Sequence, residues 1–286
     1  MTVLEKALKK WFPIFVLPTL AAFIIGFFWP FIQGLYLSFC KFTTVNNAEW
    51  VGISNYVKAI SDTSFTYSFW FTVAFVIVAS LLINIIAFAI ALALTKNLRG
   101  TNIFRTVFFM PNLIGGIVLG YIWQTLFNAL LLNLEQPLLA LNTTAGYWGL
   151  IILLCWQQIG YMMIIYIAGL QNIPPELMEA AQIDGANSWQ TLLKVKLPMV
   201  MPSITICLFL TLTNAFKLFD QNLSLTAGDP AHSTEMMALN IYYTFYARSG
   251  PQWKGIGQAK AVIFFILVVI IALTQLRATR SKEVQQ

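Results

Sequence analysis

The chain alternates between long apolar runs and short polar segments, and the length of the apolar runs indicates the class of protein. Six runs are nearly free of charge and cover residues 13–39, 69–94, 104–127, 147–170, 200–219 and 261–276. A helix needs about 20 apolar residues to cross the hydrocarbon core of a bilayer. The pattern therefore predicts an all-α integral membrane protein with six transmembrane helices. The third run contains Pro111 and Gly115-Gly116, helix breakers that are tolerated where neighbouring helices satisfy the freed backbone groups.

Composition supports this class and excludes others. Hydrophobic residues make up 58% of the 286 residues, charged residues only 10%, and the mean hydropathy is +0.73. Soluble domains carry roughly 25% charged residues, so the bilayer is the expected solvent. The net charge of +6 does not indicate nucleic-acid binding, because the basic residues lie between the apolar runs. A single histidine and three cysteines without metal-type spacing give no metal or redox site.

Basic residues gather on one side of the predicted membrane and set the orientation, because cytoplasmic loops are rich in Lys and Arg. On that side we place Lys6, Lys9, Lys10, Lys96, Arg99, Arg105, Lys194, Lys196, Arg277, Arg280 and Lys282. Both termini and the segment 171–199 are then expected in the cytoplasm. The first apolar run is too long for the core of a secretory signal, so we expect an uncleaved first span.

The cytoplasmic segment 171–199 has strong helix start and stop signals. Pro174-Pro175 suits a helix start, and Glu176 and Glu179 favour the N-terminal end of the helix dipole. Asp184-Gly185 predicts a helix end, since glycine accepts the left-handed backbone there. Ser188 is expected to help start a second short helix before Leu197-Pro198. On these signals alone, the segment could still be a passive connector between two spans.

Three motifs in this segment resemble the EAA loop of type I ABC importer permeases. They are Glu179-Ala180-Ala181, Asp184-Gly185-Ala186 and Val195-x-Leu197-Pro198. In that family the loop contains the helix that docks into a cleft on the ATPase subunit, so we call residues 171–199 the coupling loop. The resemblance implies an ATPase-coupling role for Glu179, Ala180, Ala181, Asp184, Gly185, Ala186, Leu197 and Pro198. One departure is Leu192, where the family usually has Phe.

Other motifs resemble the carbohydrate branch of this family, near the maltose and glycerol-3-phosphate permeases. They are Gly52-Ile53-Ser54-Asn55-Tyr56, Arg99-Gly100 through Phe104-Arg105-Thr106 to Pro111, Trp156-Gln157 with Gly160-Tyr161, Phe216-Lys217-Leu218-Phe219-Asp220, and Thr226-Ala227-Gly228-Asp229-Pro230. In the last motif Gly228-Asp229 replaces the family's glycine pair, so a different turn is expected. The large external insertion of some maltose-type permeases is absent, and eight spans are therefore not expected.

The resemblance implies the type I ABC importer permease (MetI-like) fold and a complete set of partners. We expect a first helix and external loop over residues 1–67, an ABC transmembrane type-1 domain over 68–276, and a cytoplasmic tail over 277–286. The implied partners are a second homologous permease subunit, two ATPase subunits and an extracytoplasmic sugar-binding protein in a prokaryotic cytoplasmic membrane. The chain has no G-x-x-x-x-G-K-[ST] sequence, so ATP and Mg are expected on the partner ATPase.

Polar residues within spans are costly in hydrocarbon and are the first candidates for a substrate path. Two clusters occur, one of Trp156, Gln157, Gln158 and Tyr161, the other of Asn214, Lys217, Asp220 and Asn222. Aromatic rings and amides suit sugar faces and hydroxyls. The resemblance adds Ala215 and Leu218, which gives as substrate-binding candidates Trp156, Gln157, Gln158, Tyr161, Asn214, Ala215, Lys217 and Leu218.

Several alternatives remain open at this point. Trp156 can be an interfacial or packing residue, and the amides can serve as hydrogen bonds between helices. Lys217 and Asp220, three residues apart, can neutralise each other on one helical face, or Lys217 can bind an acidic sugar. An ion-coupled secondary transporter, an ABC permease for a non-sugar solute, a channel and an intramembrane enzyme are the rival classes. The sequence shows no clear internal repeat, which a secondary transporter would need. It also shows no catalytic cluster, which an intramembrane enzyme would need.

Overall fold

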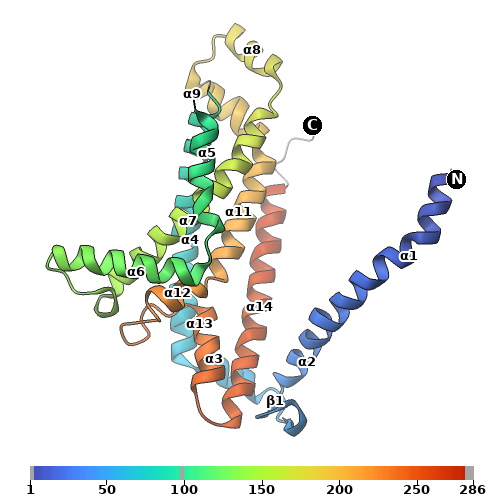
Figure 1. Cartoon of the computed structure of the whole chain (residues 1–286), viewed down its shortest axis with the longest axis vertical. Helices are drawn as coiled ribbons and strands as arrows, with labels where there is room; N and C mark the ends of the chain where they lie inside the picture. Colours follow the sequence, from blue (N-terminus) through green and yellow to red (C-terminus); the bar gives the residue numbers. More distant parts are fainter. Residues whose placement is uncertain (1–2, 97–99, 281–286) are drawn as a thin grey trace. The chain divides into compact units, whose positions relative to one another are not determined.

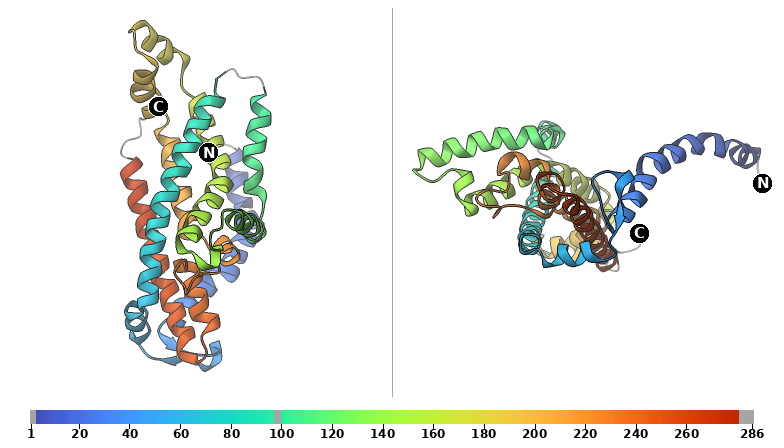
Figure 2. Two further views of the ribbon diagram at one scale, coloured as in Figure 1. Left: turned by 90° about the vertical axis from the view of Figure 1, so that its left-hand side faces the viewer. Right: turned by 90° about the horizontal axis from the view of Figure 1, so that it is seen from below.

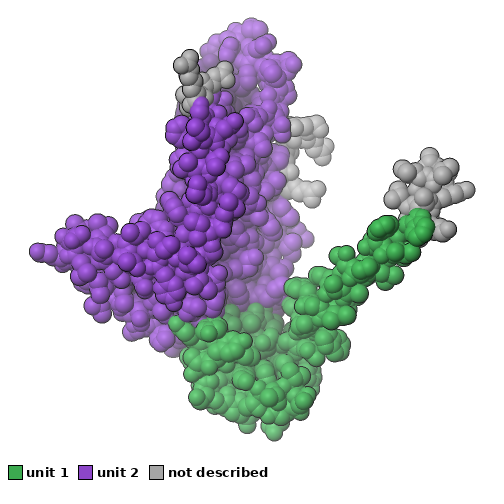
Figure 3. Space-filling view, in the orientation of Figure 1, with its two compact units in different colours: residues 1–62, 241–263 green, residues 63–240, 264–286 purple. Residues whose placement is uncertain are grey.

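The computed structural model shows a helical chain and describes residues 3–96 and 100–280. Side chains are described for residues 11–96 and 100–279. The chain divides into two compact units (Figure 3): unit 1 comprises residues 1–62 and 241–263, and unit 2 comprises residues 63–240 and 264–286. The long helix α14 (Pro251–Arg280) begins in unit 1 and ends in unit 2.

Unit 1 starts with an apolar helical stretch that is almost entirely exposed. α1 (Val3–Phe23), a π-helical turn (Ile24–Phe28) and α2 (Trp29–Leu37) contain the apolar span Trp11–Leu37, and within it only Leu37, at its end, is buried. β1 (Cys40–Lys41) then pairs antiparallel with β2 (Glu49–Trp50) around a 3₁₀ turn (Val45–Asn47). α3 (Ser54–Ser61) follows, and a second π-helical turn (Tyr243–Ala247) precedes α14. An apolar surface of this length fits contact with lipid or another span.

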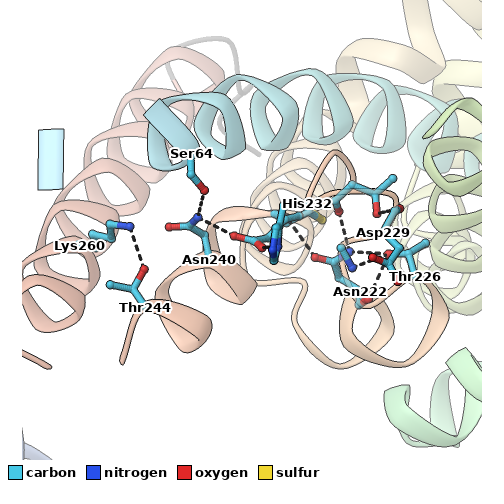
Figure 4. Close-up of polar contacts among 12 residues, drawn as sticks. Ser64, Asn222, Thr226, Asp229, His232, Asn240, Thr244 and Lys260 are labelled. Carbon is cyan, nitrogen blue, oxygen red and sulfur yellow. Dashed lines mark hydrogen bonds and ion pairs between the residues drawn. The ribbon is translucent and has the colours of Figure 1, made fainter. Parts of the chain in front are cut away.

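Unit 1 contains a buried cation. Lys260 is fully buried, and its Nζ donates to Asp62 Oδ2 at 2.8 Å and to Thr244 Oγ1 at 2.8 Å. Figure 4 shows the Lys260–Thr244 contact. Arg248 contributes a longer contact to the same carboxylate, 3.4 Å from Nη1 to Oδ2. A buried charge persists only with such partners, so these residues tie the end of α3 to the start of α14.

Unit 2 is built on three helices that pack against one another: α4 (Thr63–Leu94), α7 (Thr143–Gln171) and α11 (Met201–Phe216). Figure 2 shows them running side by side. Their contact faces hold small and branched residues; α4 buries Ala79, Ile83, Ala87 and Ala91 at a spacing of four, which is one helical face. The core is continuous with the second half of α14 through Phe264, Val268 and Ile271.

The third expected span, residues 104–127, is wrong as a single helix. The structure divides it into α5 (Thr101–Phe109), a 3₁₀ turn (Met110–Leu113) and α6 (Gly116–Asn133), with Gly115 extended between them. Pro111 and the glycine pair cause the break, and α6 runs across the direction of α5 (Figure 1). After α6 come a further 3₁₀ turn (Leu139–Leu141) and α7. α6 packs against the short helix α12 (Asp220–Leu225).

Five helices in the described part of the chain are long and apolar enough to cross a membrane, and a bent pair brings the number to six. The pair joins residues 188–199 to α11 with a bend of 70°. The six predicted spans are therefore reached when this bent pair is counted as one span. The first member of the pair consists of α9 (Ser188–Thr191), a π-helical turn (Leu192–Lys196) and α10 (Leu197–Met199), and α8 (Pro175–Ile183) precedes it in the chain. Several residues that set the predicted orientation, Lys6, Lys9, Lys10, Arg99, Arg280 and Lys282, lie outside the described side chains, as does tail segment 281–286.

The loop after α12 is held by one buried amide. Asn222 is fully buried; its Nδ2 donates to Thr226 Oγ1 at 3.0 Å and to the Thr234 carbonyl at 2.8 Å (Figure 4). Its Oδ1 accepts from the Met236 amide at 3.0 Å. Ala227 and Gly228 both adopt left-handed conformations, so the turn at the altered glycine pair is made by these two residues. α13 (Met237–Tyr242) follows. Asn222 is thus a structural residue and not part of a substrate path.

The close approach of α5 to α7 gives a test of the fold. A Cβ on Gly160 of α7 would lie 1.8 Å from the Phe108 carbonyl oxygen of α5, whereas one on Gly149 of the same helix would make ordinary contacts of 3.4 Å or more. Gly160→Ala is expected to cost about 1–3 kcal/mol by forcing the helices apart. Thermal unfolding in detergent measures this. Gly149→Ala is the matched control, and equal melting temperatures for both variants would contradict the packing.

Candidate functional site

The coupling loop forms two short helices that project from one end of α7 and α11 (Figure 1). α8 ends in a Schellman motif: the Ala186 amide donates to the Ala181 carbonyl at 2.9 Å and the Gly185 amide to the Gln182 carbonyl at 3.0 Å. Gly185 has φ +72°, a left-handed conformation that glycine adopts without strain. The stop predicted at Asp184-Gly185 is confirmed.

The second helix, α9, begins at Ser188, where the sequence predicts a helix start. Asn187 is the N-cap, and Ser188 is the first helical residue. Asn187 Oδ1 accepts from the Gln190 amide at 2.8 Å, while Gln190 Oε1 accepts from the Asn187 amide at 2.8 Å. This reciprocal pair is a capping box, in which two free amides of the helix start are satisfied at once. The turn between α8 and α9 is therefore fixed on both sides by hydrogen bonds.

A concave surface of about 400 Å³ lies within the coupling loop. It brings together four of the predicted coupling residues, Ala180, Ala181, Asp184 and Ala186, with Leu177, Gln190, Lys194 and Val195. Glu179 and Gly185 are exposed beside it, and Leu197 and Pro198 are half-buried on α10, where the chain returns towards the bend at Val200. The alanines keep this surface open, since a larger side chain there would fill it.

The tip of the loop also exposes large apolar residues that sequence analysis did not select. Ile183 is 86% exposed and Trp189 is 66% exposed. Neither lies in an apolar run, so contact with lipid tails does not explain them. Large exposed apolar side chains of this kind are candidates for a surface that another molecule covers. The signal was present in the sequence as two bulky apolar residues in a segment expected in water.

A second pocket, of about 300 Å³, lies at the other end of α11. It is lined by Leu154, Gln158, Asn214, Lys217, Leu218, Phe219, Asp220 and Gln221. Four predicted substrate residues meet here: Gln158, Asn214, Lys217 and Leu218. The Asn214 Nδ2 lies 3.4 Å from Gln158 Oε1, a long hydrogen bond that leaves both amides able to bind a further polar group. Phe219, Asp220 and Gln221 also line the pocket, and of these only Asp220 was considered from sequence.

The remaining predicted substrate residues lie outside this pocket. Gln157 is 6% exposed, and both ends of its amide are occupied: Nε2 donates to the Ile114 carbonyl at 3.2 Å and Oε1 accepts from Gln221 Nε2 at 2.7 Å. Ala215 is fully buried. Trp156 is exposed and packs edge-on against Trp123, and Tyr161 lies beside Phe109. Gln157 therefore acts in packing, as the alternative reading of the sequence allowed.

Lys217 and Asp220 do not share a helical face. α11 ends at Phe216, Lys217 is its C-cap, and Asp220 opens α12 after two non-helical residues. Both side chains are exposed, and they form no ion pair within the described part of the chain. The expectation that they neutralise each other on one helix is wrong in its geometry, because the helix breaks between them. The pocket therefore receives one positive and one negative side chain, each available.

Comparison with known proteins shows a family match and relatives that cover nearly the whole chain. Residues 85–280 match the family model of the binding-protein-dependent transport system inner membrane component. The chain is 42% identical over 282 residues to the probable starch degradation products transport system permease protein AmyD of Thermoanaerobacterium thermosulfurigenes, covering 96% of each chain. It is 32% identical to the multiple sugar-binding transport system permease protein MsmF of Streptococcus mutans, covering 99% of this chain and 100% of that one.

Solved structures share the fold. A chain of a bacterial ABC transporter involved in the import of the acidic polysaccharide alginate superposes with a TM-score of 0.81 at 21% identity, covering 98% of this chain and 99% of that one. A chain of the MetNI methionine ABC transporter superposes with a TM-score of 0.54 at 20% identity, covering 75% of this chain. The expected type I ABC importer permease fold is confirmed.

The capping box at the start of α9 gives a test of the loop geometry. Asn187→Ala removes the acceptor for the Gln190 amide and is expected to cost about 1 kcal/mol of local stability. Amide hydrogen exchange of residues 188–191 should then become about fivefold faster. Ser188→Ala is the matched control, because the Ser188 side chain does not cap the helix. If Ser188→Ala accelerated exchange as much as Asn187→Ala, the assignment of the cap would be wrong.

Proposed function

Because this chain belongs to the family of binding-protein-dependent transport system inner membrane components, we propose that it is one permease subunit of an ATP-driven importer of sugars. The observation that carries the proposal is the coupling loop: two capped helices, joined to α7 and α11, that present an open concave surface and an apolar tip. A passive connector needs neither feature. A surface for a partner protein needs both, since exposed Ile183 and Trp189 gain free energy only when covered.

The energy for transport comes from that partner. Two ATPase subunits bind ATP and Mg, and this chain neither binds nor hydrolyses the nucleotide. A second homologous permease forms the other half of the path, and an extracytoplasmic binding protein delivers the sugar. The chain lies in a prokaryotic cytoplasmic membrane with both termini in the cytoplasm, as the basic residues of the loops indicate. Glu179, Ala180, Asp184 and Gly185 belong to the ATPase contact.

The chemistry of the second pocket favours a neutral oligosaccharide. Gln158 and Asn214 offer amides for sugar hydroxyls, and Phe219 offers an aromatic side chain for an apolar sugar face. Lys217 and Asp220 contribute opposite charges, so the pocket has no excess of either sign for an acidic or basic substrate. The relatives named for starch degradation products and for multiple sugars agree with this class. Malto-oligosaccharides are therefore the first substrates to test.

Gly185 tests the role of the coupling loop. Gly185→Val places a β-branched residue at φ +72° and is expected to disorder the turn between α8 and α9. Uptake of labelled maltotriose by cells that contain the partner subunits should be abolished, while membrane insertion, measured by membrane-fraction immunoblotting, stays at the parental level. A Cβ at this position meets no atom within 4 Å, so the effect comes from the backbone and not from a clash.

Gly185→Asn is the control, because asparagine is the next best residue in a left-handed helix end. It should keep a substantial part of the uptake. Parental uptake by the Gly185→Val variant would contradict the role of the coupling loop. Loss of uptake in both variants together with loss of the protein from the membrane would show that the position matters for folding alone.

Gln158 and Trp156 test the pocket. Gln158→Ala removes a side chain that lines it, and loss of one hydrogen bond to the sugar, worth about 1.4 kcal/mol, should reduce maltotriose uptake about tenfold. Trp156→Phe keeps an aromatic contact to Trp123 outside the pocket and should transport like the parent. The reverse result would place the sugar contact at Trp156, outside the pocket. Preferential uptake of an oligouronide over maltotriose would contradict a neutral substrate.

A further inference from the structure

A buried polar network joins the three central helices of unit 2. We call Asn84, Tyr166 and Thr211 the Asn84 network. Asn84 of α4 donates from Nδ2 to Thr211 Oγ1 of α11 at 2.9 Å, and its Oδ1 accepts from the Tyr166 hydroxyl of α7 at 2.6 Å. The Asn84 Nδ2 also donates to the Ser80 carbonyl at 2.8 Å. Tyr166 is 2% and Thr211 1% exposed, so water does not compete for these bonds.

Members of the network make further contacts that hold them in place. The amide of Asn84 makes three bonds, and the Thr211 hydroxyl, besides accepting from Asn84, donates to the Cys207 carbonyl at 2.8 Å. The Tyr166 ring also meets Phe88 of α4 edge-on, with 5.3 Å between ring centroids. Hydrogen-bonded polar groups in a dry site favour one relative position of the helices, because sliding leaves a buried group without a partner.

The position of the network along the helices gives it a role in transport. α7 carries Gln158 in the pocket, Tyr166 eight residues later, and ends at Gln171 where the coupling loop begins. α11 starts after the bend that ends the coupling loop, reaches Thr211, and carries Asn214 in the pocket three residues further. With a rise of 1.5 Å per residue, Tyr166 lies about 12 Å along α7 from Gln158 towards the loop. The network thus lies between the loop and the pocket on both helices.

We propose that Asn84 is a positioning residue for energy coupling: its hydrogen bonds to Tyr166 and Thr211 make α4, α7 and α11 one rigid body, so that displacement of the coupling loop moves the pocket. The inference rests on the proposed function. Apolar helices in lipid have no hydrophobic drive to stay together, and polar contacts between helices supply part of the cohesion. Without the network, α7 and α11 can slide separately, and motion at the loop is absorbed before it reaches Gln158 and Asn214.

The experiment separates coupling from stability. The parent protein has Cys40 and Cys155 replaced by alanine, keeps the fully buried Cys207, whose carbonyl accepts from Thr211, and carries Lys217→Cys as a reporter in the pocket. It is reconstituted with its partner permease, ATPase and binding protein in proteoliposomes. The rate of labelling by a fluorescent maleimide is measured without nucleotide and after trapping with ATP and vanadate, and ATP hydrolysis is measured on the same sample. In the parent, trapping should change the labelling rate.

Tyr166→Phe and Thr211→Val each remove one hydroxyl with little change of shape. We expect each to reduce the nucleotide-dependent change in labelling about threefold, as loss of one hydrogen bond between helices would, while ATP hydrolysis stays within about twofold of the parent. Two controls should respond like the parent. Thr211→Ser keeps the hydroxyl, and Ser80→Ala removes a buried hydroxyl one turn from Asn84 that has no hydrogen-bond partner in the described part of the chain.

Three results would overturn the inference. The first is a full labelling response in both Tyr166→Phe and Thr211→Val. The second is a parallel fall of response and ATP hydrolysis in these variants, which would show a role in stability only. The third is a parent whose labelling does not respond to trapping at all; that result would overturn the proposed function itself, and the parent sample distinguishes it from the first two.

Discussion

The arrangement around the pocket depends on how the backbone is satisfied where the third apolar run breaks. A carbonyl without a partner is costly in hydrocarbon, so a break at that depth survives only where a side chain reaches it. Gln157 does this for Ile114, and its other end holds Gln221 of α12. α6 then packs on α12, where Gly120 leaves no room for a Cβ against Ser224. This amide helps to place the wall that carries Phe219 and Asp220, together with Gln124 of α6, whose Nε2 donates to the Leu225 carbonyl at 2.9 Å.

The coupling loop also depends on hydrogen bonds that satisfy the backbone where its helices end. Its two helices are too short to be stable alone, since isolated helices below about 12–15 residues are marginal. The Schellman motif at Gly185 and the capping box at Asn187 satisfy the ends of both helices, and the loop keeps one shape without a core of its own. A surface of fixed shape can receive a partner without first being ordered, which lowers the cost of binding. Its rigidity therefore serves the contact directly.

The sequence predicted a span well where the length of the apolar run was enough to identify it. It predicted poorly whether such a run forms one unbroken helix. The span expected at residues 13–39 occurs at Trp11–Leu37, whereas residues 104–127 are mostly apolar and yet divide at Pro111 and Gly115. For the site, Gly185 was predictable because one residue defines the turn. Gln157 and Gln158 were not separable, because adjacent helical residues point about 100° apart and packing decides which one faces the pocket. Asn84, Tyr166 and Thr211, up to 127 residues apart, gave no local signal.

The connectivity of the chain explains why coupling needs no long path through the protein. α7 enters the coupling loop and α11 leaves it, and both carry pocket residues within about 20 Å of the loop along the helix axis. A helix transmits axial and tilting motion over that length with little loss, because its backbone hydrogen bonds resist stretching. Two helices moved at the same end by the same loop nevertheless need a connection to move together, since apolar side chains slide in lipid at small cost. The pocket therefore follows the loop only as far as the polar contacts between α4, α7 and α11 hold.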